Sequence, residues 1–147
     1  AGLNIALGTD GPASNNCLDM FKEMTLAFSL TKLANQDANS LSAYEILKMA
    51  TVNGAKAMNL TNCDILEVGK KADIIEIDLA QPNMQPLNNI INNIVYSGSK
   101  ENVIMTMING KILYEKGRFF VGEPVENIYK KCQEVTDRIE KELQQSK

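Results

Sequence analysis

A single strand-like segment near the N-terminus, followed only by helical sequence up to about residue 60, is the strongest constraint on how this chain folds. The apolar run Leu3–Leu7 ends at Gly8, and residues with strand character return only after residue 60. A parallel strand needs neighbouring βα units to pair with it and cover it, so one such strand cannot form a parallel sheet. Residues 1–60 are therefore expected to be the end of a larger α/β arrangement. The chain also begins at Ala1, almost directly in this segment, as expected of a fragment.

Asp10 follows the apolar run, at the place where parallel α/β folds position their chemistry. The local sequence is Gly8-Thr9-Asp10-Gly11-Pro12. Asp-Gly-Pro is also an ordinary turn signal, in which the Asp side chain bonds its own backbone, and taken alone the stretch favours that turn. The chain contains no histidine, and a catalytic transition metal normally has three or more protein ligands, usually including histidines. Asp10 can therefore be at most one part of a metal site.

Composition excludes several classes of function. With 147 residues and 44% hydrophobic content, the chain has the size of one globular domain. A net charge of −3 with scattered Lys and Arg gives no basic stripe, so nucleic acid is not an expected partner. No apolar run approaches the roughly 18 residues of a membrane span, and no signal peptide is evident. We expect a cytoplasmic protein that does not bind a membrane.

The three cysteines give no metal or disulfide signal. Cys17, Cys63 and Cys132 are odd in number, far apart and without paired spacing. Neither a disulfide framework nor a structural zinc site is indicated. We interpret them as reduced thiols that serve packing.

Helical periodicity dominates both ends of the chain. Apolar spacing predicts a helix over 17–35, with Asn16 and Asp19 as a capping arrangement. Ser42 and Glu45 fit a capping box that starts two short helices, which are interrupted near Asn53-Gly54 and reach Leu60. From Glu123 onward helical spacing returns and predicts a C-terminal helix with one apolar face.

Short strand-like runs occupy the middle of the chain. Asn109-Gly110 between two of them is the strongest short hairpin signal. The predicted strands are 65–68, 73–78, 94–96, 103–108 and 111–115. We predict that Lys70 and Lys71 lie in a β-turn that follows Gly69.

Four ordered motifs resemble the amidohydrolase superfamily. The nearest subgroup is that of the 5-methylthioadenosine/S-adenosylhomocysteine deaminases, with chlorohydrolases and guanine deaminases as relatives. The motifs are 8–24 (GTDGPASNN, then LDMF and EM), 50–57 (ATVNGAKA), 67–75 (EVGKKADII) and 85–97 (QPL and VYS). The resemblance covers residues 3 to about 120. It implies the last βα unit of a (β/α)8 metal-dependent hydrolase barrel in 1–60, the C-terminal part of a small composite β domain in 61–122, and a terminal helix in 123–147.

The resemblance also implies a role for Asp10. The family's matching aspartate lies beside a divalent metal, usually zinc or iron. It contacts the metal or its bound water, helps to deprotonate that water, and passes the proton toward the leaving amine of the substrate. Asp10 is thus the candidate catalytic, metal-binding and substrate-binding residue. Ser14 and Asn15 are weaker candidates for substrate contact, because helix capping and loop stabilisation explain them at least as well.

Two functions remain open on the sequence. In the first, the chain is the C-terminal fragment of an aminohydrolase that deaminates adenine nucleosides, and the fragment alone is inactive because the histidine ligands belong to earlier strands. Alternatively, the chain is a fragment of a related guanine deaminase or chlorohydrolase. In the second, the chain is a noncatalytic module that self-associates through its uncovered apolar surface. Homo-oligomers are expected in either case.

Overall fold

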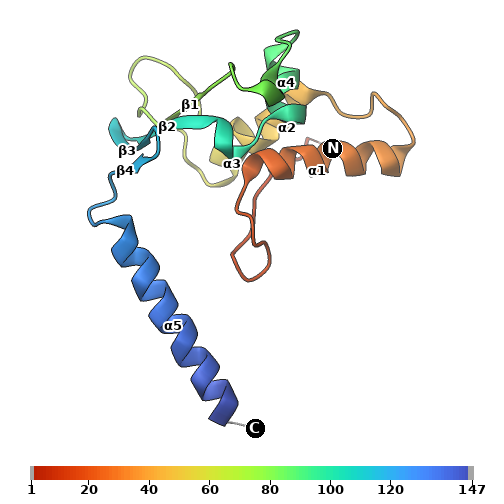
Figure 1. Ribbon diagram of the computed structural model, residues 1–147. Helices are drawn as coiled ribbons and strands as arrows, with labels where there is room; N and C mark the ends of the chain where they lie inside the picture. The colour runs from red at the N-terminus through yellow and green to blue at the C-terminus, as the bar shows by residue number, and fades with distance from the viewer. Residues whose placement is uncertain (1, 146–147) are drawn as a thin grey trace.

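The computed structural model describes residues 2–145 and has a helical N-terminal part, an antiparallel sheet and a projecting C-terminal helix (Figure 1). The α-helices are α1 (Met20–Asn35), α2 (Ala43–Ala50), α3 (Val52–Ala57), α4 (Ile90–Ser97) and α5 (Val125–Gln145). The strands are β1 (Ile74–Ile77), β2 (Val103–Ile108), β3 (Lys111–Glu115) and β4 (Arg118–Phe119). Short 3₁₀ turns at Pro82–Met84 and Lys100–Asn102 flank α4.

The core lies where α1, α2 and α4 meet. Its buried members are Phe21, Met24, Ala43, Ile46 and Val95, from all three helices. The helices pack closely enough that Gly98 is required after α4, since a Cβ there would lie 2.4 Å from the Ile94 carbonyl oxygen and 2.8 Å from the Phe21 ring. This core is contiguous with the N-terminal segment, because Leu7 packs against it.

Capping residues set where the helices begin. The capping box of Ser42 and Glu45 is confirmed, with the Glu45 amide donating to Ser42 Oγ at 3.2 Å and the Ser42 amide to Glu45 Oε2 at 2.9 Å. Helix α1 begins later than predicted, and its N-cap is Asp19 rather than Asn16. The Asp19 carboxylate accepts the Phe21 amide at 3.0 Å.

The sheet is a meander of antiparallel strands in the order β1-β2-β3-β4. The predicted strands at 73–78, 103–108 and 111–115 are confirmed to within a residue, as is the hairpin between β2 and β3. Asn109 and Gly110 have φ of 49° and 78°, the left-handed pair that a tight hairpin needs. Asp73 supports the turn by accepting the Asn109 amide at 2.6 Å.

Two predicted strands are wrong. Residues 94–96 belong to α4, since Asn89 caps a helix by accepting the Asn92 amide at 3.1 Å. β-branched residues suggested a strand there, but burial against α1 and α2 selects the helix. Residues 65–68 form a loop instead, and Val68 is fully exposed. Without a pairing strand or a buried face, these residues lack the interactions that would stabilise a strand.

The N-terminal segment and the α2–α3 junction also differ from expectation. Leu3–Leu7 is extended but pairs with no strand in residues 2–145. The break between α2 and α3 lies at Thr51, with φ −129° and ψ −95°, and not at Asn53-Gly54. At this break the Thr51 hydroxyl donates to the Leu47 carbonyl at 2.7 Å.

Helix α5 extends away from the sheet (Figure 1). Its predicted apolar face is present but exposed, and no residue of the helix is buried. The exposed apolar side chains include Tyr129, Val135, Ile139 and Leu143. No helix among residues 2–145 combines the length and apolar character that a bilayer crossing requires.

Candidate functional site

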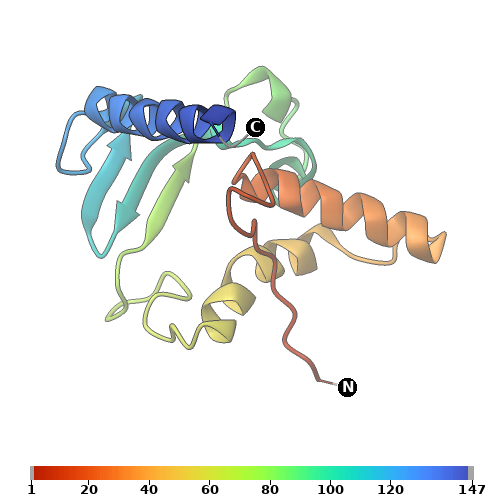
Figure 2. The same cartoon turned by 90° about the horizontal axis from the view of Figure 1, so that it is seen from below.

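The segment that carries Asp10 is held by the junction of α2 and α3. The Leu7 amide donates to the Met49 carbonyl at 2.9 Å. The Asn53 side-chain amide donates to the Ile5 carbonyl at 2.8 Å, and the Asn4 side-chain amide donates to the Asn53 carbonyl at 3.0 Å. Figure 2 shows the segment running past both helices before it turns toward α1. The sequence predicted Asn53 only as part of a helix interruption and not as a contact of the N-terminal segment, although its place in the 50–57 motif was an available signal.

Asp10 lies on the surface in a left-handed conformation, with φ of 56°. Its Oδ1 accepts the amide of Gly11 at 2.8 Å, and the Thr9 hydroxyl donates to the Asp10 carbonyl at 3.3 Å. The Ser14 and Asn15 amides both bond the Gly11 carbonyl, which closes the turn. The expected Asp-Gly-Pro turn is therefore present. It leaves Asp10 Oδ2 without a hydrogen bond from residues 2–145.

The two weaker candidates differ in their contacts. Asn15 is half-buried, donates to Glu23 Oε1 at 2.6 Å and accepts the Cys17 amide at 3.0 Å. Its side chain thus ties the turn to α1. Ser14 is exposed, and its hydroxyl makes no hydrogen bond within the described part of the chain. Of these two side chains, Asn15 is therefore the one with a structural role in the described residues.

The described residues do not form a complete metal site. Within residues 2–145 no group of three His, Cys, Asp or Glu side chains is placed to hold an ion. The Asp10 carboxylate has the chemistry of one oxygen ligand or proton acceptor, and it is presented to solvent. It fits a metal site only as one contributor.

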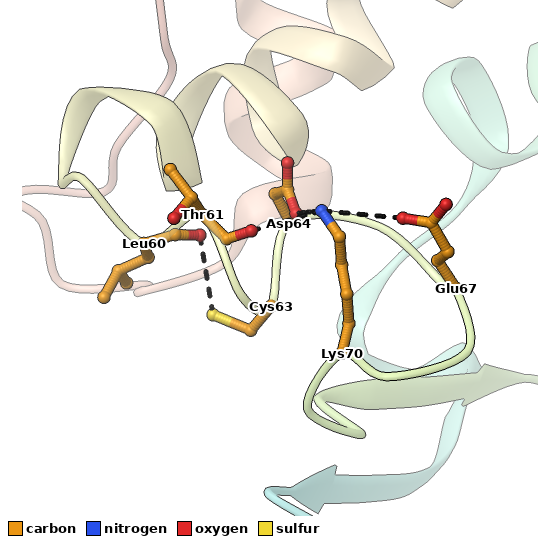
Figure 3. Close-up of polar contacts among 6 residues, drawn as sticks. All are labelled: Leu60, Thr61, Cys63, Asp64, Glu67 and Lys70. Atoms are coloured by element: carbon orange, nitrogen blue, oxygen red, sulfur yellow. Dashed lines mark hydrogen bonds and ion pairs between the residues drawn. The ribbon is translucent and has the colours of Figure 1, made fainter.

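The loop after α3 is the other polar cluster (Figure 3). Lys70 Nζ forms an ion pair with Asp64, donates to the Thr61 carbonyl at 3.1 Å and lies 4.0 Å from Glu67 Oε2. The hydrogen bond from Lys70 lowers the pKa of the Asp64 carboxyl below 3.8. These contacts satisfy Lys70 within its own loop. They are consistent with the predicted turn, although the strand before it is absent.

Cys63 lines a cavity of about 370 Å³ between this loop and β1. Its thiol lies 3.9 Å from the Leu60 carbonyl oxygen. Desolvation is the largest cause that raises the pKa of Cys63 above 9.0, followed by the neighbouring Asp73 carboxylate. A thiol that stays protonated is a weak nucleophile and metal ligand. Cys17 and Cys63 are half-buried, whereas Cys132 is exposed on α5, so the interpretation of Cys132 as a packing thiol is wrong.

Comparison with known proteins establishes the family. The family model for the amidohydrolase family matches residues 1–113, and the chain therefore belongs to the amidohydrolase family. It is similar to 5-methylthioadenosine/S-adenosylhomocysteine deaminase of Caldanaerobacter subterraneus subsp. tengcongensis, with 48% identity over 130 residues, 87% of this chain and 30% of the relative. It is also similar to 5'-deoxyadenosine deaminase of Methanosarcina mazei, with 40% identity over 141 residues, 94% of this chain and 32% of the relative.

A solved structure has the same fold over nearly the whole chain. The zinc-bound adenosine deaminase from Xanthomonas campestris matches with a TM-score of 0.89 and 34% identity, covering 95% of this chain and 32% of that chain. The chain thus spans about a third of the length of the proteins it matches. The resemblance to amidohydrolases is confirmed, and so is a small α/β fold of the amidohydrolase-family deaminase type.

Proposed function

We propose that this chain forms the C-terminal third of a metal-dependent aminohydrolase that hydrolytically deaminates adenine nucleosides of the S-adenosylhomocysteine or 5-methylthioadenosine type. The observation that supports this most is 48% identity over 87% of the chain to a deaminase with that name. The similarity to 5'-deoxyadenosine and adenosine deaminases supports the same adenine-nucleoside class.

The uncovered N-terminal segment supports the barrel assignment. We propose that residues 1–60 are the last βα unit of a (β/α)8 barrel, that 61–122 are the C-terminal part of a composite β domain, and that 123–147 are the C-terminal helix. Residues 1, 146 and 147 lie outside the described part of the chain. Leu3 is 80% exposed and Ile5 58% exposed, although both are apolar residues of an extended segment. In a complete barrel such residues pair with neighbouring strands and are buried.

Asp10 is the residue that we propose acts in the reaction. Oδ2 has no hydrogen bond from the described residues, so it is free to accept a proton from the attacking water and to deliver it to the leaving amine. A divalent zinc or iron ion, held by other parts of the complete enzyme, would supply an activated water at neutral pH. Asp10 also contacts that ion and the substrate in this proposal. The exposed Ser14 hydroxyl is a secondary substrate contact.

Two proteins test this function. The 147-residue chain alone, incubated with 5-methylthioadenosine and added zinc, iron or manganese, is expected to release no ammonia. A chimera, in which this chain replaces the matching C-terminal third of the Caldanaerobacter relative, is expected to be active. Turnover by the chain alone, or a folded but inactive chimera, would contradict the proposal.

Asp10→Asn in the chimera isolates the carboxylate. It is expected to lower kcat by about 1,000-fold or more, because the amide cannot accept the proton. Asp19→Asn is the matched control, since asparagine caps helices as well as aspartate does and activity should be retained. Equal activity of the Asp10→Asn chimera and its parent would exclude Asp10 from the reaction.

Self-association remains the alternative role, and the exposed apolar face of α5 is the observation that favours it. We propose that the chain alone forms homo-oligomers through this face. Sedimentation velocity over a wide concentration range checks this, and a sharp monomer at all concentrations would contradict it. The cytoplasmic location stays a prediction.

A further inference from the structure

The break between α2 and α3 frees backbone and side-chain groups that bind the extended N-terminal segment. In a continuous helix the Met49 carbonyl would accept the amide of Asn53, four residues later. Because the helix breaks at Thr51, the Met49 carbonyl instead accepts the amide of Leu7 at 2.9 Å. Asn53, in the first turn of α3, is then the side chain that reaches the extended segment.

Asn53 uses both its side chain and its backbone for this contact. Its Nδ2 donates to the Ile5 carbonyl at 2.8 Å, and its own carbonyl accepts Asn4 Nδ2 at 3.0 Å. Ile5 is 58% exposed, so apolar burial does little to hold this part of the chain. The extended segment is thus fixed by hydrogen bonds around Asn53 and, at Leu7, by packing on the core.

We propose that Asn53 is a positioning residue for Asp10, an inference that rests on the function proposed above. Asp10 follows Leu7 by three residues, a span of at most about 11 Å of chain, so the last fixed point on this side determines where the carboxylate can lie. The turn after Asp10 is tied to α1 through Asn15 and Glu23. Asn53 holds the chain at Ile5, two residues before Leu7, and therefore acts on Asp10 through the short segment from Ile5 to Leu7.

Two substitutions remove the contact without weakening α3. Asn53→Asp keeps the size of the side chain but replaces the donating amide with an oxygen that repels the Ile5 carbonyl oxygen. It does not destabilise α3, because a carboxylate is favourable in the first turn of a helix. Asn53→Ala removes the side chain and has high helix propensity. Lys56→Ala, on the exposed side of the same helix, is the control because no side-chain contact is lost.

Amide hydrogen exchange on the 147-residue chain is the first measurement. We expect the Leu7 amide to exchange at least about fivefold faster in both Asn53 variants, because loss of the hydrogen bond to the Ile5 carbonyl makes local opening of the segment easier. The amides of β2 and β3 should keep their exchange rates. Lys56→Ala should leave all these rates unchanged. Unchanged exchange at Leu7, or equal acceleration throughout the chain, would overturn the proposal.

Kinetics of the active chimera then test the link to Asp10. Displacement of a reacting group by about 1 Å can cost 100-fold, so we expect kcat to fall by about 10- to 100-fold in Asn53→Asp with KM changed less than twofold. A merely structural role would lower the amount of folded enzyme and leave its kcat unchanged, which would refute the positioning role. If the parent chimera is inactive, the proposed function fails while the exchange result stands.

Discussion

The helical part and the sheet are organised by different kinds of interaction. The strands of the sheet pair in chain order, and the β2–β3 turn takes its backbone conformation from Asn109 and Gly110, with one added hydrogen bond to Asp73. The N-terminal segment instead depends on Met49 and Asn53, more than forty positions away. Local signals therefore specify the β2–β3 hairpin, whereas long-range contacts hold the segment that leads to Asp10.

Burial differs between the same two regions. Ile46 and Val95 in the helical core are completely buried. No residue of the four strands is buried, and their side chains are half-buried or exposed. The sheet therefore draws little stability from a core within the described chain, and the helical part draws most of it.

Ile46→Ala is expected to have the largest effect on stability. It removes a fully buried side chain from the contact of α2 with α1 and α4, which should lower the free energy of unfolding by about 2–5 kcal/mol. Ile75→Ala makes the same chemical change in β1, where the side chain is 51% exposed, and should cost about 1 kcal/mol or less. Denaturant titrations measure both. Equal losses would break the comparison between core and sheet.

Asn102→Ala tests the junction between the two regions. Asn102 is 1% exposed, and its Oδ1 accepts the Ser99 amide and Asn83 Nδ2, both at 2.9 Å. Removing it leaves the Ser99 amide without its partner and Asn83 Nδ2 with only the Ser97 carbonyl as acceptor, at a cost of about 1–3 kcal/mol. Asn62→Ala, an exposed loop position, is the control and should change stability by less than about 0.5 kcal/mol. Equal stability of both variants would contradict a structural role for this network.

The errors in the sequence analysis follow the same division. The capping box at Ser42, the hairpin at Asn109-Gly110 and the C-terminal helix were predictable because each signal lies within a few residues. Residues 94–96 were wrongly predicted as a strand because the choice of helix depends on burial against two distant helices.

The candidate site was predictable in part. Asp10 and its turn were recognised from local sequence, but Asn53 was not, because its role exists only once the helix break brings it to the N-terminal segment. The histidine ligands that the family resemblance implies could not be placed from this chain, since it contains no histidine. Whether Asp10 reacts stays a prediction.

A pair of glycine substitutions compares backbone requirements in the two regions. Gly110→Ala places a side chain at φ 78° and should lower the free energy of unfolding by about 1–2 kcal/mol. Gly54→Ala, within α3 and with no atom nearer than 4.0 Å to the added Cβ, should raise it by about 0.5–1 kcal/mol. Thermal unfolding measures both shifts, and shifts of the same sign would contradict the assigned conformations.

The smallest expected effect is the pH dependence of the capping box. Hydrogen bonds from Ser42 hold the pKa of Glu45 below its usual 4.5 in the folded chain. A carboxyl with a lowered folded pKa stabilises the fold above its unfolded pKa, and this contribution disappears as pH falls through the folded pKa.

Glu45→Gln separates this contribution from the rest of the chain, because glutamine can complete the capping box without titrating. The difference in stability between parent and variant should be constant above about pH 5 and should shift in favour of the variant below pH 4.5. The pKa of Asp64 is likewise lowered, by Lys70, but Asp64 is present in both proteins, so its contribution to stability cancels in the difference. A shift in the opposite direction would mean that folding raises the pKa of Glu45, and the capping box would then not stabilise the start of α2.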